Sequence, residues 1–349
     1  MPHKGLALTA LLILSLAQPG RAGFGFGLGK AAAKKSAEAV AKSTPHAAGY
    51  FTGYIGGNTN SNGGQSNPPL ESVPGISVKW AYVGEPVLYA SPAVADDGTV
   101  YFGTSHHFVY YNGYWKDGKK PPELPYGLFA YTPGGTLKWK YSDGGDAPVR
   151  GSPAIGPDGT IYIVIERLGA SRMDTSEELH AISPLGVQKW KVVISTTYAE
   201  IGALTPSIAA DGTIYVAGRD LTAYAPDGTL KWRDHSSQSN TSLYFASPAI
   251  GSDGTIYSVH WSTYGSWGQV LRAYAPDGEI LWSSPDLGTY PMTGSPSIAA
   301  DGTIYIGFHD TQGLANNMGA LAAITPAGGL KWVFSTGDFD VRSAPVIAE

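Results

Sequence analysis

The chain has 349 residues, of which 43% are hydrophobic and 15% are charged, a composition that excludes a protein disordered throughout. The net charge of −5 gives no overall attraction to nucleic acid. Because the chain has no cysteine, disulfides, thiolate metal sites and cysteine nucleophiles are excluded. The 46 glycines are well above the usual share and, with 25 prolines and 21 tyrosines, favour short strands joined by tight turns.

Residues 1–22 have the pattern of a secretory signal peptide. A short cationic start leads into an apolar run from Gly5 to Ala17, and small residues precede a cleavage point after Ala22. The run is too short for a membrane-spanning helix, which needs about 20 apolar residues. We therefore expect an exported protein with no transmembrane segment in its mature chain, in the periplasm, at the cell surface or secreted. An uncleaved N-terminal anchor is the alternative.

Residues 23–49 are of low complexity and predict a flexible linker. Their glycine-rich start, GFGFGLGK, lacks the spacing of a phosphate-binding loop. Residues 50–349 are expected to form the folded domain.

A strand–turn–strand unit recurs five times in this domain, as in SPAVADDGTVYFG from Ser91 and SPAIGPDGTIYIV from Ser152. Each unit is followed by a second hairpin, as in LTAYAPDGTLKW from Leu221, and the repeat has a period of about 50 residues. Asp-Gly between β-branched and aromatic residues is a strong hairpin signal. Both faces of the strands are apolar, so each small sheet must be covered on both sides. The prediction is all-β: a β-propeller of four-stranded antiparallel blades, with five complete repeats and a partial sixth.

The sixth unit lacks two of its strands. RSAPVIAE, at residues 342–349, matches the first strand of a unit, and ISVKW, ending at Trp80, matches a fourth strand. Two alternatives stay open at this point: residues 48–60 supply the missing strands, or the given sequence is part of a longer chain with more blades.

The motifs SPAI-x-x-DGTIY and LxAxxPDGxxKW resemble the repeat of the pyrroloquinoline-quinone (PQQ)-binding-like β-propeller family, from about Tyr54 to Glu349. That family includes quinoprotein dehydrogenases and a periplasmic scaffold lipoprotein. The resemblance implies that the tryptophans closing the fourth strands dock neighbouring blades. These are Trp80, Trp139, Trp190, Trp232, Trp282 and Trp332.

The resemblance does not by itself imply a bound cofactor. Dehydrogenases of the family typically use a carboxylate base, calcium ligands and often adjacent cysteines. Here the cysteine pair is absent and no Asp or Glu matches the base. We expect no cofactor, with PQQ and calcium as the alternative.

In an up-and-down blade the Asp-Gly turns lie on one side and the long, variable connections on the other. Binding residues concentrate in loops placed by a rigid framework, so the loop side is the predicted binding face. Aromatic, Arg and His side chains there suit a protein or polysaccharide partner. The candidates are His106, Arg167, Arg219, Asp220, His260, Trp261, His309 and Asp310.

We expect no metal site, because these histidines follow no ligand spacing, and no catalytic residues, because neither G-x-S-x-G nor H-E-x-x-H is present. The predicted function is a monomeric, non-catalytic binding or scaffolding module for a protein or polysaccharide of the cell envelope, not for nucleic acid. The alternatives are a PQQ-dependent oxidoreductase and a structural cell-surface repeat protein.

Overall fold

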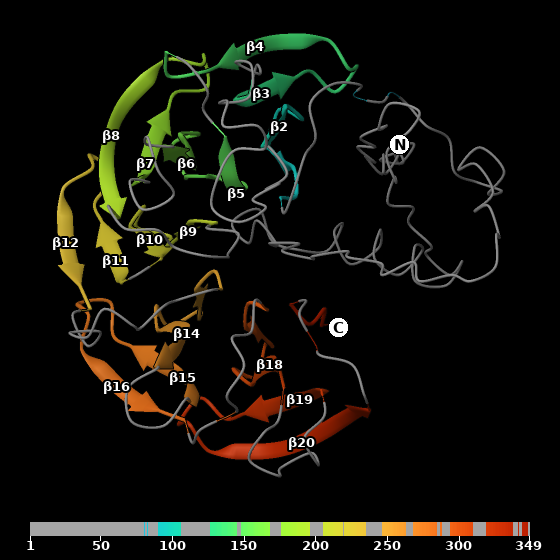
Figure 1. Cartoon of the computed structure of the whole chain (residues 1–349), viewed down its shortest axis with the longest axis vertical. Coiled ribbons are helices and arrows are strands. Elements are labelled where there is room, and N and C mark those ends of the chain that lie inside the picture. Colours follow the sequence, from blue (N-terminus) through green and yellow to red (C-terminus); the bar gives the residue numbers. More distant parts are fainter. Residues whose placement is uncertain are drawn as a thin grey trace, which may run out of the picture.

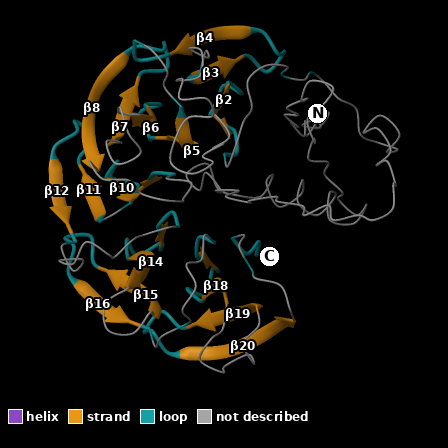
Figure 2. Cartoon of the chain, viewed as in Figure 1, coloured by secondary structure: helices purple, strands orange, loops and turns teal. Residues whose placement is uncertain are grey.

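The computed structural model shows an all-β protein. It describes residues 80, 82 and 90–347, except 106–125, 145–147, 168–175, 196–204, 219, 235–245, 263–267, 285–286, 288–293, 310–318, 338–340 and 342–343. These residues form five antiparallel sheets of four strands each, and none of them is helical (Figure 2). The predicted fold class is confirmed. No helix in this described part has the length and hydropathy to cross a membrane.

Each sheet is a simple up-and-down meander in which consecutive strands pair. The first sheet holds β1 (Ala93–Val94), β2 (Val100–Gly103), β3 (Leu128–Tyr131) and β4 (Leu137–Tyr141). The second holds β5 (Val149–Ile155), β6 (Ile161–Arg167), β7 (Ser176–Ile182) and β8 (Gln188–Ser195). The third holds β9 (Ser207–Ile208), β10 (Ile214–Ala217), β11 (Leu221–Tyr224) and β12 (Leu230–Arg233). The fourth holds β13 (Ala249–Ile250), β14 (Ile256–Ser262), β15 (Gly268–Tyr274) and β16 (Ile280–Ser283). The fifth holds β17 (Ser297–Ile298), β18 (Ile304–His309), β19 (Gly319–Ile324) and β20 (Leu330–Gly337).

The five sheets stand side by side in an arc, as blades of a propeller (Figure 1). The fourth strands, β4, β8, β12, β16 and β20, form the outer rim, and the first strands lie toward the centre. The first and fifth blades border the open side of the arc.

The repeated Asp-Gly-Thr and Lys-Trp motifs fasten each blade internally. In the second blade Asp158 accepts hydrogen bonds from the Thr160 N–H (3.0 Å) and hydroxyl (2.7 Å), which holds the turn before β6. Lys189 on β8 reaches across to Asp158 (3.0 Å) and to the Thr160 Oγ1 (2.8 Å). The same Lys–Thr contact ties Lys138 to Thr99, Lys231 to Thr213 and Lys331 to Thr303, each at 2.9 Å. In the fourth blade Leu281 occupies the lysine position.

Hydrophobic clusters fill the spaces between neighbouring blades. One cluster joins Leu128 and Ala130 of the first blade to Ile161, Ile163 and Ile165 of the second. Each of the next three junctions has its own cluster. Because neighbouring blades cover both faces of the second, third and fourth sheets, their inner strands are buried at nearly every position, as in β6 and β10, rather than at alternate ones.

A tryptophan also closes each junction at the outer rim. The indole N–H of Trp139 donates to the carbonyl of Pro184 in the next blade, at 2.9 Å. Gly186, two residues on, has φ +81°, and a Cβ there would stand 2.7 Å from the indole. The same bond joins Trp80 to Pro133 (3.2 Å), and Trp190, Trp232 and Trp282 to Pro226, Pro276 and Pro326, each at 2.8 Å. Four of these indoles thus dock neighbouring blades, and Trp80 binds the first blade.

Candidate functional site

The two sides of the propeller differ in what they present. The Asp-Gly side carries uniform turns closed by the Lys–Asp–Thr contacts described above. The other side receives the connections after the second and fourth strands of each blade, most of which lie outside the described residues. The strand ends that lead into these connections carry most of the remaining ionised side chains.

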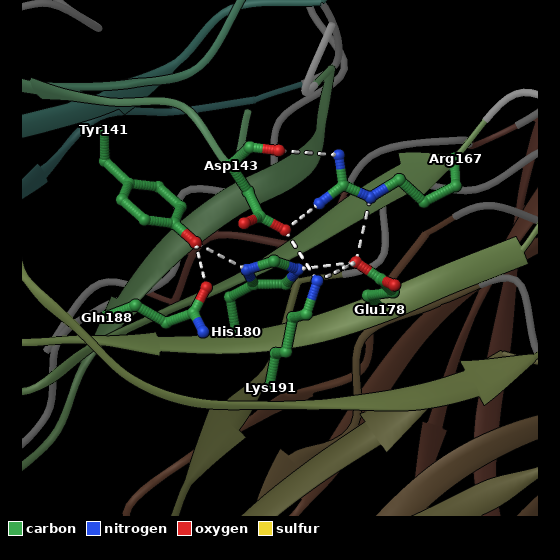
Figure 3. A network of polar contacts seen from close by, with 7 residues as sticks. All are labelled: Tyr141, Asp143, Arg167, Glu178, His180, Gln188 and Lys191. Carbon is green, nitrogen blue, oxygen red and sulfur yellow. Dashed lines mark hydrogen bonds and ion pairs between the residues drawn. The ribbon is translucent and has the colours of Figure 1, made fainter. Parts of the chain in front are cut away.

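A network of charged side chains joins the first two blades near these strand ends (Figure 3). Arg167, the last residue of β6, binds Asp143 of the first blade and donates from Nε to Glu178 on β7 at 2.9 Å. Lys191 on β8 reaches the Asp143 carboxylate at 2.8 Å and that of Glu178 at 3.7 Å. The side chains of Asp143 and Arg167 are about one-quarter exposed, so solvent reaches the network.

A buried histidine extends the network inward. His180 on β7 has no exposed side-chain surface, and its Nε2 lies 3.0 Å from the Glu178 carboxylate. Its Nδ1 lies 2.8 Å from the hydroxyl oxygen of Tyr141, and that hydroxyl donates to the Oε1 of Gln188 at 2.6 Å. Because a carboxylate only accepts hydrogen bonds, the Nε2 of His180 carries a proton. The imidazole ring of His180 therefore connects the partly exposed ion pairs to Tyr141, which belongs to the hydrophobic cluster between the first two blades.

The environment lowers the pKa values of Asp143, Glu178 and His180, but for different reasons. A hydrogen bond from Lys191 holds the pKa of Asp143 below its usual value, with help from Arg167. Burial acts to raise the pKa of Glu178, but hydrogen bonds from Arg167 and His180 outweigh it and lower that pKa. Burial lowers the pKa of His180, against the attraction of Glu178 and Asp143. At neutral pH both carboxylates are ionised and matched by Arg167 and Lys191.

Asp143, Glu178 and His180 each place one ligand atom within 4.8 Å of the other two. A cation at this point would have to displace Arg167 and Lys191, whose nitrogens already occupy the same carboxylate oxygens. This triad is therefore not open to an ion such as the calcium that would accompany PQQ. We derive no step through that cofactor.

A second charged cluster lies between the second and third blades. Glu166 on β6 and Glu177 on β7 are paired in register, and both are buried. The Nε of Arg150 on β5 stands 3.7 Å from the Glu166 carboxylate, and Gly218 of the third blade lies beside Glu177. Burial raises the pKa of Glu177 to about 7; Arg150 opposes the shift and Glu166 adds to it. This cluster is sealed from solvent.

Two further ion pairs lie at the next strand ends. Asp220 stands 3.8 Å from the Nε of Arg233 in the third blade. Asp234 lies 3.4 Å from Arg272 of the fourth blade and accepts a 2.7 Å hydrogen bond from Tyr274. His260 on β14 is buried, and burial, with the neighbouring charge of Arg272, lowers its pKa to about 4.

The structure thus locates three of the predicted face residues in full. Arg167 is held in the first network, Asp220 pairs with Arg233, and His260 is buried. Trp261 is the last residue but one of β14, and His309 is the last residue of β18, both on the loop side; the side chains of these two residues lie outside the described part of the structure. His106, Arg219 and Asp310 also lie outside them.

The sequence analysis did not single out Asp143, Glu178, His180 or Lys191. These residues come from two repeats and three separate segments, so no local spacing connects them. One signal was present: Glu178 and His180 are polar residues of the third strand of their unit, two positions apart and therefore on one face.

No protein-family model matches the chain, and no curated protein matches it. Among solved structures, it is similar to a europium-containing methanol dehydrogenase at 12% identity and a TM-score of 0.49, over 74% of this chain and 62% of that one. It is also similar to the V. cholerae biofilm matrix protein Bap1 at 17% identity and a TM-score of 0.39, over 70% of this chain and 37% of that one. The periplasmic gluconolactonase PpgL of Pseudomonas aeruginosa gives 14% identity and a TM-score of 0.44, over 72% of this chain and 70% of that one. This chain thus spans less than two thirds of the first two proteins, and we draw no argument about activity from the three.

Proposed function

We propose that this β-propeller is an exported, non-catalytic binding module that engages a protein or polysaccharide through its loop side. The observation that carries the proposal is the contrast between the two sides. The Asp-Gly side is closed by the same short contacts in four of the five blades. The loop side carries the long connections and the partly exposed network of Asp143, Arg167 and Lys191.

The chemistry of the described residues also supports binding over catalysis. In the first network each carboxylate is matched by Arg167 or Lys191, and Tyr141 and His180 bond to each other and to Gln188 or Glu178. A general base needs a proton of its substrate within hydrogen-bond reach, and a nucleophile needs an adjacent base. Among the described residues these groups instead satisfy one another, which suits a rigid support for the loops.

Two substitutions on the loop side test the proposal. Arg219→Ala and Trp261→Ala should weaken capture of a partner from an envelope extract and leave the melting temperature nearly unchanged. Both positions belong to the loop side: Arg219 lies between β10 and β11, and Trp261 lies next to the connection that follows β14. The matched control is Leu185→Ala, on an exposed turn of the Asp-Gly side, which should leave capture unchanged. Loss of folding in the loop-side variants, or equal loss of capture in the control, would contradict the proposal.

Titration with PQQ and calcium distinguishes the oxidoreductase alternative. Our proposal predicts no saturable quinone binding and no dye-linked oxidation of alcohols or sugars. Saturable PQQ binding together with turnover would show that the protein is a PQQ-dependent oxidoreductase and would contradict the proposed binding module.

A further inference from the structure

Consecutive hydrogen bonds link Glu178, His180, Tyr141 and Gln188 across the junction of the first two blades (Figure 3). Each of these three bonds needs one proton. A carboxylate and an amide oxygen supply none, and the Tyr141 hydroxyl supplies one. His180 must therefore supply the other two, one at Nε2 and one at Nδ1. The arrangement in which the Gln188 Oε1 faces the hydroxyl is thus that of a positively charged imidazole ring.

The surroundings of His180 favour a neutral ring at neutral pH. The side chain has no exposed surface, and burial lowers its pKa below the ordinary value of 6.5. Of the charged groups that face it, Glu178 and Asp143 attract a positive ring, whereas Arg167 repels one. Lys191, which lies in register with His180 on β8, contacts the same two carboxylates. At pH 7 the ring therefore carries one proton rather than two.

A half-turn of the Gln188 amide accommodates the neutral ring. The neutral His180 keeps its proton on Nε2, which faces the Glu178 carboxylate, and its Nδ1 becomes an acceptor. The Tyr141 hydroxyl then donates to Nδ1, and its oxygen accepts a hydrogen bond from the Nε2 of Gln188. The hydroxyl keeps its proton, because burial raises the pKa of Tyr141. Gln188 is exposed and its amide holds both a donor and an acceptor, so this side chain serves both arrangements.

We propose that His180, Tyr141 and Gln188 form a pH-sensitive relay at the junction of the first two blades. On acidification a proton from solvent binds the Nδ1 of His180, the Tyr141 hydroxyl turns from Nδ1 to Gln188, and the Gln188 amide turns its oxygen inward. The surrounding cluster, in which two carboxylates balance Arg167 and Lys191, then has an excess positive charge. The relay is independent of the proposed binding role of the loop side.

The experiment is NMR of the full chain with isotope-labelled histidine and glutamine side chains, from about pH 8 downward. The His180 ring is assigned by its nuclear Overhauser contacts to Tyr141, whose ring centre lies 6.0 Å away, and the Gln188 amide by its loss in Gln188→Met. At pH 8 the ring should carry its proton on Nε2 alone. Below pH 6.5 the Nδ1 resonance should shift, and the Gln188 amide signals should shift with the same midpoint.

Tyr141→Phe separates the relay from a direct effect of the ring charge on the amide. This substitution removes the hydroxyl that connects His180 to Gln188 and leaves the ring able to bind a proton. His180 should still titrate, whereas the shift of the Gln188 amide signals on acidification should fall several-fold. His260 is the matched control, because it is buried in another blade with a pKa of about 4. Its titration should be the same in both proteins.

A His180 ring that carries two protons at pH 8, titration of Nε2 in place of Nδ1, or different midpoints for His180 and Gln188 would overturn the proposal. An amide shift of undiminished size in Tyr141→Phe would also overturn it. If the protein unfolds before His180 titrates, hydrogen exchange at neutral pH decides. The NH₂ protons of Gln188 should exchange several-fold more slowly in the unaltered protein than in Tyr141→Phe, because one of them donates to the hydroxyl. Equal exchange rates would overturn the proposal.

Discussion

Glu166 and Glu177 face each other directly across β6 and β7, and both carboxyl groups are buried. Like charges in register on neighbouring strands destabilise a sheet. Arg150, whose Nε lies 3.7 Å from Glu166, offsets one of the two negative charges. Protonation of Glu177 removes the second negative charge, in keeping with the pKa of about 7 for that carboxyl group.

Glu177→Gln should flatten the pH dependence of stability between about pH 4.5 and 7. The carboxyl group holds its proton more tightly in the folded state, since its pKa rises from 4.5 to about 7. Its stabilising effect is therefore full below pH 4.5 and is lost as the pH rises toward 7. At about 1.4 kcal/mol for each pKa unit, the loss is at most about 3 kcal/mol. Urea unfolding of the unaltered protein and of Glu177→Gln, from pH 4.5 to 8, measures this loss of stability.

The adjacent Glu178 is a matched control of opposite sign. Its pKa is lowered in the folded state, so its ionised form contributes stability that is present above the unfolded pKa and is lost as the pH falls. Glu178→Gln should therefore destabilise the protein at neutral pH, where Glu177→Gln should stabilise it. If Glu177→Gln and Glu178→Gln change the free energy of unfolding in the same direction at pH 8, the assignment of charges in the two clusters is wrong.

Gly186→Ala should be markedly more destabilising than Gly144→Ala. Both glycines have positive φ, +81° and +71°, so both variants incur backbone strain of about 1 kcal/mol. Only the Cβ at position 186 meets a neighbour, the Trp139 indole at 2.7 Å, and overpacking there should cost a further ~1–3 kcal/mol. Denaturant unfolding compares the two. Equal losses would show that the indole moves aside and that the close contact does not fix the blade junction.

Leu281→Lys should stabilise the fourth blade slightly. Asp253 and Thr255 form the same turn as in the other blades, and the lysine that would bridge them is missing. Leu281 is half exposed, so the lost apolar burial is small. An exposed ion pair with its hydrogen bond contributes roughly 0.2–1 kcal/mol, and salt screens it. A gain at low salt that disappears at 1 M salt is expected; an equal gain in Leu281→Met would refute the electrostatic explanation.

Tyr141→Phe and Gln188→Ala should be energetically coupled. The 2.6 Å hydrogen bond between these side chains crosses the junction of the first two blades, and Tyr141 is buried. A double-mutant cycle should give a coupling free energy of about 0.5–1.5 kcal/mol. Additive effects would mean that the junction depends on apolar packing alone.

The repeat made the blades predictable, because each Asp-Gly turn and each Lys-Trp ending is a local signal. Gly159 shows why: its φ of +78° is what the turn before β6 requires. The Lys189–Thr160 contact was not predicted, since it joins motifs 29 residues apart. The burial of His260 and Glu166 was also not predicted, because strand ends next to long loops read as exposed when the neighbouring blade is not considered. The network around His180 was not predicted for the same reason, because Tyr141 and Asp143 come from the neighbouring first blade.

The measurement that tests the central claim most directly is photo-crosslinking in cells from position 261, at the loop-side end of β14, with position 185 on the Asp-Gly side as control. Mass spectrometry identifies the adducts. Our account predicts a discrete adduct with a protein or polysaccharide from position 261 and none from position 185. Folded protein that gives no adduct from position 261, or the same adducts from both positions, would contradict a binding role for the loop side.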